Sequence, residues 1–187
     1  MLILLTGEPG VGKSTVLMRL VDILKEEGIS VGGVIAREVR DDAGKRRVGF
    51  EFVNVVDGSR ARLASVVVIV VGMEGPRIGR YCVDLDGCRT AATMLINAMN
   101  SRSRVIVFDE IGPMELLSPS IVEVLRALLD AVSRKHVTAI VVIHKRFKHW
   151  IISRYREMAS VAIEVNRDNR DALPSMLLNT IKDKMGK

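Results

Sequence analysis

The 187-residue chain contains no glutamine, only two cysteines and few aromatic residues. Cys82 and Cys88 are too few and too poorly spaced for a zinc site of the usual type, so we expect simple thiols, although intracellular disulfides do occur in hyperthermophiles. Aromatic residues make up 4% of the chain, so a core must be built mainly from valine, isoleucine, leucine, methionine and alanine. Such residues suit a parallel sheet that is buried on both faces.

Long hydrophobic runs are also missing. The apolar stretch Leu2–Leu5 is too short for a signal peptide, and Val66–Val71 is far below the roughly 20 residues that a membrane span needs. We therefore expect a soluble cytoplasmic protein without a membrane segment. The absence of glutamine, together with many arginine, valine and isoleucine residues, favours a thermophilic source.

A complete phosphate-loop pattern, G-x-x-x-x-G-K-[ST], directly follows the first apolar run and precedes a helical pattern. The nucleotide-binding residues that it predicts are Gly7, Glu8, Pro9, Gly10, Val11, Gly12, Lys13, Ser14 and Thr15. Glycines permit the sharp turn that lets backbone N–H groups and a helix N-terminus wrap the phosphates. Lys13 would reach the β- and γ-phosphates, and the Ser14 hydroxyl would bind Mg²⁺. The sequence therefore predicts a nucleotide-binding protein, and its formal charge of +6 agrees with an anionic partner.

Helical and extended patterns alternate on both sides of a β-rich segment. Apolar spacing predicts a first helix over about 13–27, ended by Gly28. From about 29 to 85 the extended runs are 30–39, 47–56, 63–71 and 78–85, the first two forming a hairpin. Later helices are expected at 88–99, from Pro119 with Ser118 as N-cap, at 147–158 and at 170–184, and strands at 104–108, 137–143 and 160–165.

This order predicts an α/β fold: a P-loop NTPase three-layer sandwich with a mostly parallel, doubly wound sheet and a β-rich insertion after the first helix. The length fits one domain that spans residues 1–187. No internal repeat, low-complexity segment or linker interrupts it. We expect a monomer.

Two carboxylates follow the apolar strand pattern 105–108. Asp109 is the candidate ligand for Mg²⁺ and could hold the ion through a water molecule. In phosphate-loop enzymes an acidic residue at the end of the second strand of the nucleotide site has this role. Glu110 could polarise a water molecule against the γ-phosphate, which would make the protein a hydrolase, or it could cap the loop or pair with an arginine. We assign Glu110, Lys13 and His144 as catalytic candidates and Ser14 and Asp109 as metal ligands.

The segment Asp109–Leu116 reads Asp-Glu-Ile-Gly-Pro-Met-Glu-Leu and resembles the signature of the thermophile-type nucleoside-triphosphatase family. Further agreement lies in 38–40, 46–50, 83–85, 169–170 and 173–174. The resemblance covers nearly the whole chain, least clearly at 65–75. It implies a Mg²⁺-dependent hydrolase of ATP, GTP, CTP and UTP with broad base tolerance and slow turnover. It also implies a catalytic glutamate and an additional strand between the loop strand and the acidic strand.

Several side chains allow two interpretations. His144 ends a strand pattern, where it could sense the γ-phosphate, as the resemblance supports, or simply face solvent. Glu115 could support the site or begin a helix. Among Arg40, Arg47, Arg77 and Arg80, one could supply transition-state charge, although surface ion pairs are the simpler explanation.

Basic and aromatic residues alternate over 145–156, which could track a nucleic acid strand, but an amphipathic helix with inward aromatic side chains is favoured. Trp150 or Arg170 could instead border the base. A switch GTPase is disfavoured because no N-K-x-D sequence is present. The alternatives that stay open are a nucleoside or small-molecule kinase and a nucleic-acid-dependent ATPase.

Overall fold

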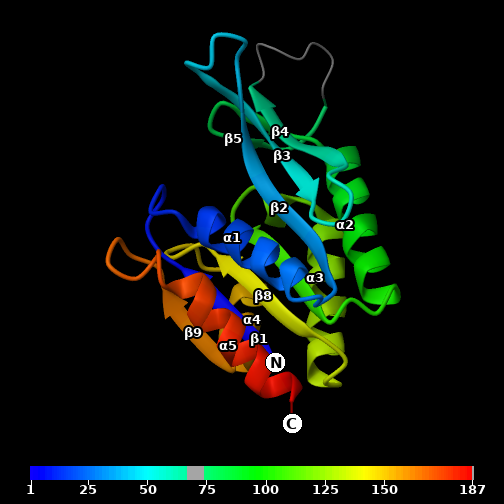
Figure 1. The fold of residues 1–187 in the computed structure, drawn as a ribbon. Coiled ribbons are helices and arrows are strands. Elements are labelled where there is room, and N and C mark those ends of the chain that lie inside the picture. Colours follow the sequence, from blue (N-terminus) through cyan, green and yellow to red (C-terminus); the bar gives the residue numbers. More distant parts are fainter. Residues whose placement is uncertain (67–73, 187) are drawn as a thin grey trace.

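The computed structural model describes residues 1–66 and 74–186, which form one mixed sheet with helices on both faces (Figure 1). The strands are β1 (Leu2–Thr6), β2 (Val31–Arg40), β3 (Arg47–Asn54), β4 (Arg60–Val66), β5 (Arg77–Ile78), β6 (Tyr81–Val83), β7 (Val105–Ile111), β8 (Thr138–Ile143) and β9 (Val161–Glu164). The helices are α1 (Lys13–Glu26), α2 (Leu85–Asn100), α3 (Pro119–Ser133), α4 (Trp150–Met158) and α5 (Leu173–Met185), with a 3₁₀ turn η1 (Glu115–Leu117).

The sheet consists of two halves. The strand order is β5-β6-β4-β3-β2-β7-β8-β1-β9. The last five strands in this order, β2, β7, β8, β1 and β9, run parallel and form the parallel half. The strands β3, β4, β6 and β5 continue from β2 with antiparallel pairing and form the antiparallel half. Strand β8 lies between β1 and β7, which is the additional strand that the family resemblance implies. The predicted α/β fold class with a mostly parallel central sheet is confirmed.

Strand β2 belongs to both halves because it pairs with β7 on one side and β3 on the other. Its Gly33 has a φ of 117°, and a Cβ atom there would lie 2.0 Å from the Val107 carbonyl oxygen. Only glycine allows β2 to approach β7 so closely in this conformation. The segment 29–85 therefore supplies one strand of the parallel half and, in the described residues, all strands of the antiparallel half.

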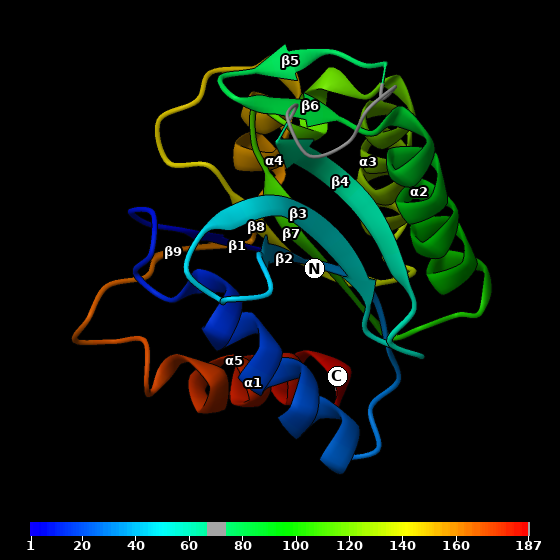
Figure 2. The same ribbon diagram turned by 90° about the horizontal axis from the view of Figure 1, so that it is seen from above.

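Helices α1 and α5 cover one face of the sheet, and α2, α3 and α4 cover the other, as the view from above shows (Figure 2). Alternation along β1 divides its side chains between the two cores: Ile3 and Leu5 pack with α1 and α5, and Leu2 and Leu4 with the opposite layer. All four side chains are at most 1% exposed. Burial on both faces explains why the parallel strands are almost continuously apolar.

Some predicted boundaries are wrong, each for a local reason. The expected strand 78–85 is divided between β5 and β6 by a turn at Gly79, which has a φ of 56°. The expected helix 147–158 begins only at Trp150, since His149 caps α4 by accepting a hydrogen bond from the Ile151 N–H. Likewise α5 begins at Leu173, after a turn-rich stretch.

Ser118 does precede α3, with Pro119 in the first turn, but its side chain makes no cap hydrogen bond; its hydroxyl lies 2.9 Å from that of Ser120. Of the extended run expected at 63–71, the part up to Val66 belongs to β4, and the remainder lies outside the described residues. Both cysteines are buried, and desolvation raises the pKa of the Cys88 thiol to about 11. Among the helices in the described ranges, none combines the length and apolar character of a membrane span.

Candidate active site

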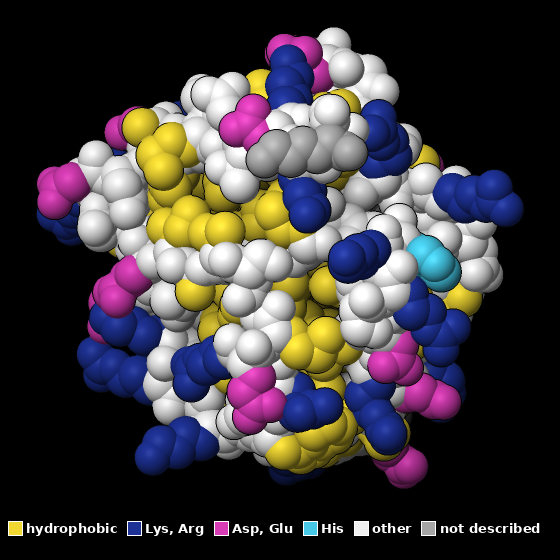
Figure 3. Space-filling model, turned by 90° about the horizontal axis from the view of Figure 1, so that it is seen from below, with side chains coloured by type: hydrophobic (Ala, Val, Ile, Leu, Met, Phe, Trp, Pro, Cys, Tyr) yellow, Lys and Arg dark blue, Asp and Glu magenta, His cyan; other side chains and the backbone are white. Residues whose placement is uncertain are grey.

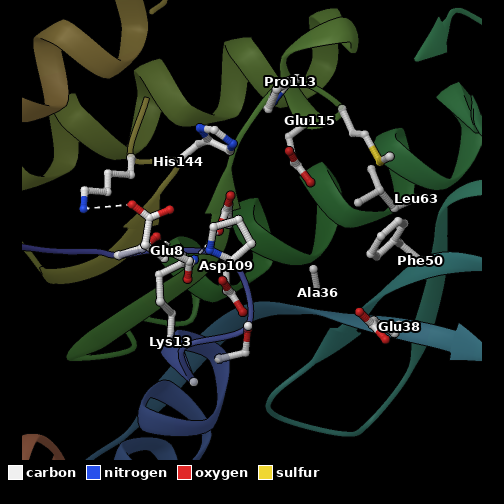
Figure 4. A pocket seen from close by; sticks show the side chains of 18 of the residues that line it. Glu8, Lys13, Ala36, Glu38, Phe50, Leu63, Asp109, Pro113, Glu115 and His144 are labelled. Atoms are coloured by element: carbon white, nitrogen blue, oxygen red, sulfur yellow. Dashed lines mark hydrogen bonds and ion pairs between the residues drawn. The ribbon is translucent and has the colours of Figure 1, made fainter. Parts of the chain in front are cut away.

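A cleft of about 680 Å³ opens beside the ends of β1, β7 and β8 and continues along the antiparallel half (Figure 4). All the site residues predicted from the sequence line it except Val11. The carbonyl oxygen of Val11 instead accepts a hydrogen bond of 3.4 Å from Arg170. Phosphate loop, acidic strand and His144 are thus brought together, as expected for an α/β sheet that binds ligands at the carboxyl ends of its strands.

The phosphate loop joins β1 to α1 through residues in the left-handed region. Gly12, with a φ of 107°, is the N-cap of α1 and has no side chain to cap it. The first N–H groups of the helix are therefore left for a ligand, which is the property of an anion site. Gly7 is equally restricted, because a Cβ atom there would lie 2.6 Å from the Val165 carbonyl oxygen.

The Lys13 amine lies over the loop that precedes it, and the residue is only 8% exposed. Its Nζ donates hydrogen bonds to the carbonyl oxygens of Gly7 (3.1 Å) and Glu8 (3.4 Å). The same Nζ lies 3.5 Å from Oε2 of Glu110. One cation therefore joins the phosphate loop to the end of β7, in a position where a phosphate could replace Glu110 as its partner.

Asp109 is the most deeply buried carboxylate of the cleft, with an exposed fraction of 2%. Its Oδ2 has no hydrogen-bond partner among the described residues. Desolvation raises the pKa of Asp109 to about 7; a hydrogen bond from Ser14 opposes this rise, and the charge of Glu110 adds to it. A buried oxygen without a partner is costly, so a site of this kind calls for a ligand that satisfies it.

Glu110 and Glu115 flank Gly112. A Cβ atom at Gly112 would lie 3.0 Å from Oε2 of Glu115 and 3.4 Å from Oε1 of Glu110. The Gly112 N–H donates to the Glu115 carboxyl at 3.1 Å, and Glu115 as a residue is 7% exposed. Desolvation raises the pKa of Glu115 to about 8, with the charges of Glu110 and Asp109 adding to the shift. Glu115 thus both begins η1 and lines the cleft, which combines its two interpretations.

His144 lines the cleft and is only partly exposed. Its backbone N–H donates to the Ile111 carbonyl oxygen (3.0 Å), which ties the end of β8 to β7. Its Nδ1 accepts from the backbone N–H groups of Phe147 (3.0 Å) and Arg146 (3.3 Å). This assigns the proton of the neutral ring to Nε2, the nitrogen that is left to donate to a ligand.

A second contact joins the loop after β8 to the phosphate loop. The Glu8 carboxylate pairs with Lys145 (3.0 Å) and Arg146 (2.9 Å), and Lys145 also pairs with Glu164 (2.7 Å). Hydrogen bonds from Lys145 and Arg146 lower the pKa of Glu8. The sequence pattern marked Glu8 only as a loop residue and did not show these partners.

Of the four arginines considered from the sequence, Arg47 is the one that lines the cleft in the described part of the chain. Its guanidinium pairs with Glu38 at 2.8 Å and lies 5.2 Å from the ring centre of Phe50. Arg40 binds the same Glu38, and Arg80 lies over Tyr81. The positions of the Arg40 and Arg47 side chains are therefore explained by ion pairs with Glu38 at the surface.

The basic and aromatic segment does not form one surface. Tyr155 is fully buried and donates from its hydroxyl to the Leu125 carbonyl oxygen at 2.9 Å. Trp150 is 51% exposed, lies under Arg126 and is not among the described residues that line the cleft. Arg170 does approach the phosphate loop, since a Cβ atom at Gly12 would lie 3.6 Å from its Cδ.

Sequence reasoning missed one wall of the cleft. It consists of apolar side chains contributed by β2, β3, β4, β5 and the loop after β7: Ala36, Phe50, Leu63, Ile78 and Met114. We call this part the apolar half of the cleft, and the part around Lys13 and Asp109 the phosphate half. Phe50 and Met114 lie within the family-like segments, but nothing in the sequence marked them as parts of one wall.

A second hollow, of about 530 Å³, lies near the chain termini between the ends of α3 and α5. Lysine and arginine side chains surround exposed hydrophobic side chains on this side of the molecule (Figure 3). In the described part of the chain, its lining includes no predicted site residue. The first cleft is therefore the candidate active site.

Comparisons with known proteins agree with this site. A family model described as NTPase matches residues 2–178. The nucleoside-triphosphatase THEP1 of Methanopyrus kandleri is 39% identical over 181 residues, which cover 96% of this chain and 94% of that protein. Two solved structures each superpose with a TM-score of 0.78: a human cancer-related nucleoside triphosphatase (31% identical, 97% of both chains) and THEP1 from Aquifex aeolicus (26% identical, 97% and 99%). The chain belongs to the NTPase family, a family of nucleoside-triphosphatase enzymes.

Proposed function

We propose that this chain is a Mg²⁺-dependent phosphohydrolase that converts ATP, GTP, CTP and UTP with water into the diphosphate and phosphate. The observation that carries the proposal is the convergence of Lys13 and Glu110, whose charged atoms are 3.5 Å apart at the end of the phosphate loop. A cation for the γ-phosphate and a base for water then share one point of the cleft. The names of the relatives support nucleoside triphosphates as substrates.

The phosphates would lie on the loop between β1 and α1. The uncapped N–H groups of the first turn of α1 donate to them, and Lys13 exchanges its carbonyl and carboxylate partners for phosphate oxygens. The positive end of the α1 dipole adds to this attraction. Binding thus relies on backbone atoms and one buried cation.

The residues present fit a magnesium ion. Asp109 offers an unsatisfied, buried carboxylate oxygen, and Ser14 offers a hydroxyl beside it. No cluster of three or more histidine, cysteine or acidic residues that could enclose a metal occurs in the described ranges. This agrees with Mg²⁺, which usually takes few protein ligands and keeps phosphate oxygens and water. When bound, the ion would neutralise charge on the β- and γ-phosphates.

Glu110 would orient the attacking water and accept its proton. Its carboxylate pairs with Lys13 at 3.5 Å and would become available when Lys13 turns to phosphate. His144 presents Nε2–H to the cleft and would donate to a γ-phosphate oxygen. These assignments give Lys13, Glu110 and His144 the roles that the sequence suggested.

Broad base tolerance is supported by the loop after β9, which lies near the phosphate loop through Arg170. Asn169 uses both amide atoms within this segment, accepting from the Asn166 N–H and donating to the Glu164 carbonyl oxygen. The Asn166 oxygen likewise accepts from two backbone N–H groups. Because these side-chain amides already form hydrogen bonds within the loop, they are not available to bond to the edge of a nucleotide base. We therefore expect weak discrimination between bases.

Slow turnover is supported by the arginines of the cleft. Among the described residues that line it, Arg47 is paired with Glu38 and Arg146 with Glu8. Neither guanidinium is free to stabilise the transition state without breaking an ion pair. An arginine in that role contributes roughly 10³-fold or more where it acts.

The test is steady-state phosphate release from ATP, GTP, CTP and UTP at elevated temperature, with Mg²⁺ or with EDTA. We expect release from all four nucleotides, at rates within about tenfold of one another, and none with EDTA. Parallel reactions contain RNA or candidate nucleoside acceptors. Release that appears only with RNA, or phosphate transferred only to a nucleoside, would contradict the proposal in favour of the nucleic-acid-dependent ATPase or the kinase.

A further inference from the structure

The two halves of the cleft differ in chemistry. The phosphate half is built from backbone N–H groups, Lys13 and two carboxylates, whereas the apolar half is built mainly from five hydrophobic side chains, and the charged side chains on the same strands, Glu38 and Arg47, are paired with each other. Phe50 and Leu63 lie across the cleft from Lys13 and Glu8 in the close-up view, and Glu115 lies between these two groups (Figure 4). The phosphates of a nucleoside triphosphate match the groups of the phosphate half, but they do not match the hydrophobic side chains of the apolar half.

The apolar half lies on the γ-phosphate side of the site. Lys13 and Glu110 meet where the last phosphate is expected, and Ala36 stands on β2 next to Ile35, the register partner of Asp109 on β7. The segment near the opposite end of the phosphate loop, 166–170, is not among the described residues that line this cleft. A nucleotide whose γ-phosphate meets Glu110 therefore points its base away from Phe50 and Leu63.

Two carboxyl groups stand where the halves meet. Glu110 and Glu115 both approach the same side of Gly112, at 3.4 and 3.0 Å from the position that a Cβ atom would take. Glu110 is paired with a cation and can accept a proton, while the buried Glu115 keeps its proton near neutral pH because desolvation raises its pKa to about 8. A hydroxyl group can donate to the first carboxyl and accept from the second.

We propose that the apolar half of the cleft is the binding site of a phosphoryl acceptor, a small apolar molecule that carries a hydroxyl group. The inference rests on the proposed function, since it uses the same γ-phosphate and the same Glu110. Phe50, Leu63, Ile78 and Met114 would enclose the apolar body. Hydrolysis is then the reaction that occurs when water occupies the acceptor's place.

The transfer step balances without any further reactant. The acceptor oxygen forms a bond to the γ-phosphorus, and the bond from that phosphorus to the bridging β–γ oxygen breaks. The hydroxyl proton passes to the Glu110 carboxylate. The products are a nucleoside diphosphate and a phosphate monoester of the acceptor, with no change in oxidation state.

The test uses ATP and Mg²⁺ with benzyl alcohol, 2-naphthalenemethanol or 1-hexanol as acceptor, and glycerol as a hydroxyl compound without an apolar body. Free phosphate and phosphate monoester are quantified by mass spectrometry, and alcohol binding is followed by ligand-observed NMR. Ala36→Leu fills the apolar half, and Ala43→Leu adds the same volume in the exposed β2–β3 turn. Phe50→Ala, at a half-buried position, serves as the second variant if Ala36→Leu does not fold.

We expect monoester from at least one apolar alcohol and none from glycerol, with no competition between alcohol and ATP. The ratio of monoester to free phosphate should fall at least about tenfold in Ala36→Leu and stay unchanged in Ala43→Leu. Binding without monoester, or an unchanged ratio in Ala36→Leu and Phe50→Ala, overturns the acceptor site. Competition with ATP also overturns it, because the apolar half would then hold the base. Loss of phosphate release from ATP alone is a separate result that contradicts the proposed hydrolysis instead.

Discussion

The parallel and antiparallel halves of the sheet contribute to the cleft in different ways. The parallel half ends in polar and ionisable groups at fixed chain positions: Lys13 after β1, Asp109 and Glu110 on β7, and His144 after β8. The antiparallel half contributes the faces of its strands, with Ala36 and Phe50 among the side chains that they expose to the cleft. Chemistry at strand ends leaves a short motif in the sequence, whereas a wall made from strand faces does not.

Replacing Glu110 by glutamine tests the chemical role of the parallel half. We expect the rate of phosphate release to fall by about 10²–10⁴-fold, because the amide cannot accept the proton of the attacking water. Nucleotide affinity should persist, since Lys13 loses its competing carboxylate partner. Single-turnover kinetics and equilibrium binding measure the two effects. The exposed Glu123→Gln on α3 is the control, and near-normal turnover of Glu110→Gln would refute the assignment.

Gly33→Ala tests whether β2 holds the two halves together. A Cβ atom 2.0 Å from the Val107 carbonyl oxygen, at a φ of 117°, must displace β2 from β7. We expect a loss of about 3 kcal/mol or more in the free energy of unfolding, measured by urea denaturation. Gly44→Ala in the β2–β3 turn is the comparison, because nothing lies within 4 Å of its Cβ position and only its φ of 67° is unfavourable. Equal losses in both variants would show that the contact with β7 is unimportant.

Glu115→Gln tests the buried carboxyl between the halves. Its pKa is about 8 in the folded protein, against an ordinary glutamate value of 4.5 that applies to the unfolded chain. The folded state therefore holds the proton more tightly. Glu115 therefore contributes stability that is fully present below about pH 4.5 and is lost as the pH rises to about 8. The glutamine variant cannot ionise and therefore removes this pH dependence, which the difference between the two pKa values places at a few kcal/mol. Urea unfolding of both proteins at pH 5, 7 and 9 measures it, and a pH-independent difference would contradict the burial argument.

Glu8→Gln tests the ion pairs that link the phosphate loop to the loop after β8. The Glu8 carboxylate and its partner Arg146 are 48% and 77% exposed, so we expect only a small loss of stability, no larger than that of an ordinary surface ion pair. Thermal unfolding at low and high salt measures it, with Glu157→Gln, which removes an exposed pair with Arg154, as the control. A much larger loss than in the control would mean that these contacts hold the parallel half together.

The elements of the parallel half could be predicted because each leaves a periodic or terminal signal. Gly28 marked the end of α1, and the carboxylates 109–110 marked the region where β7 ends, although β7 continues through them to Ile111 and does not stop at 108 as expected. The order of strands in the antiparallel half could not be read in this way. The division of 78–85 into β5 and β6 depends on the left-handed Gly79, which in the sequence is one glycine among 15.

The candidate site shows the same division. The phosphate-loop motif predicted Lys13 and Ser14, and the family-like segment included Glu115 without fixing its role. The contact between Glu8 and Lys145 spans 137 positions in the chain and leaves no local pattern. The apolar half depends on which face of β3 and β4 turns inward, and this is set by tertiary pairing with β2.

Strand β2 pairs parallel with β7 and antiparallel with β3, and this change of pairing has a consequence for protein engineering. Because the phosphate loop and its acidic strand belong to the parallel half, substitutions on the cleft-facing side of β3, β4 and β5 leave their backbone connections untouched. A library that varies Phe50, Leu63 and Ile78 would diversify what the cleft accepts while keeping its nucleotide machinery constant. Such a scaffold is suited to laboratory evolution toward new small molecules.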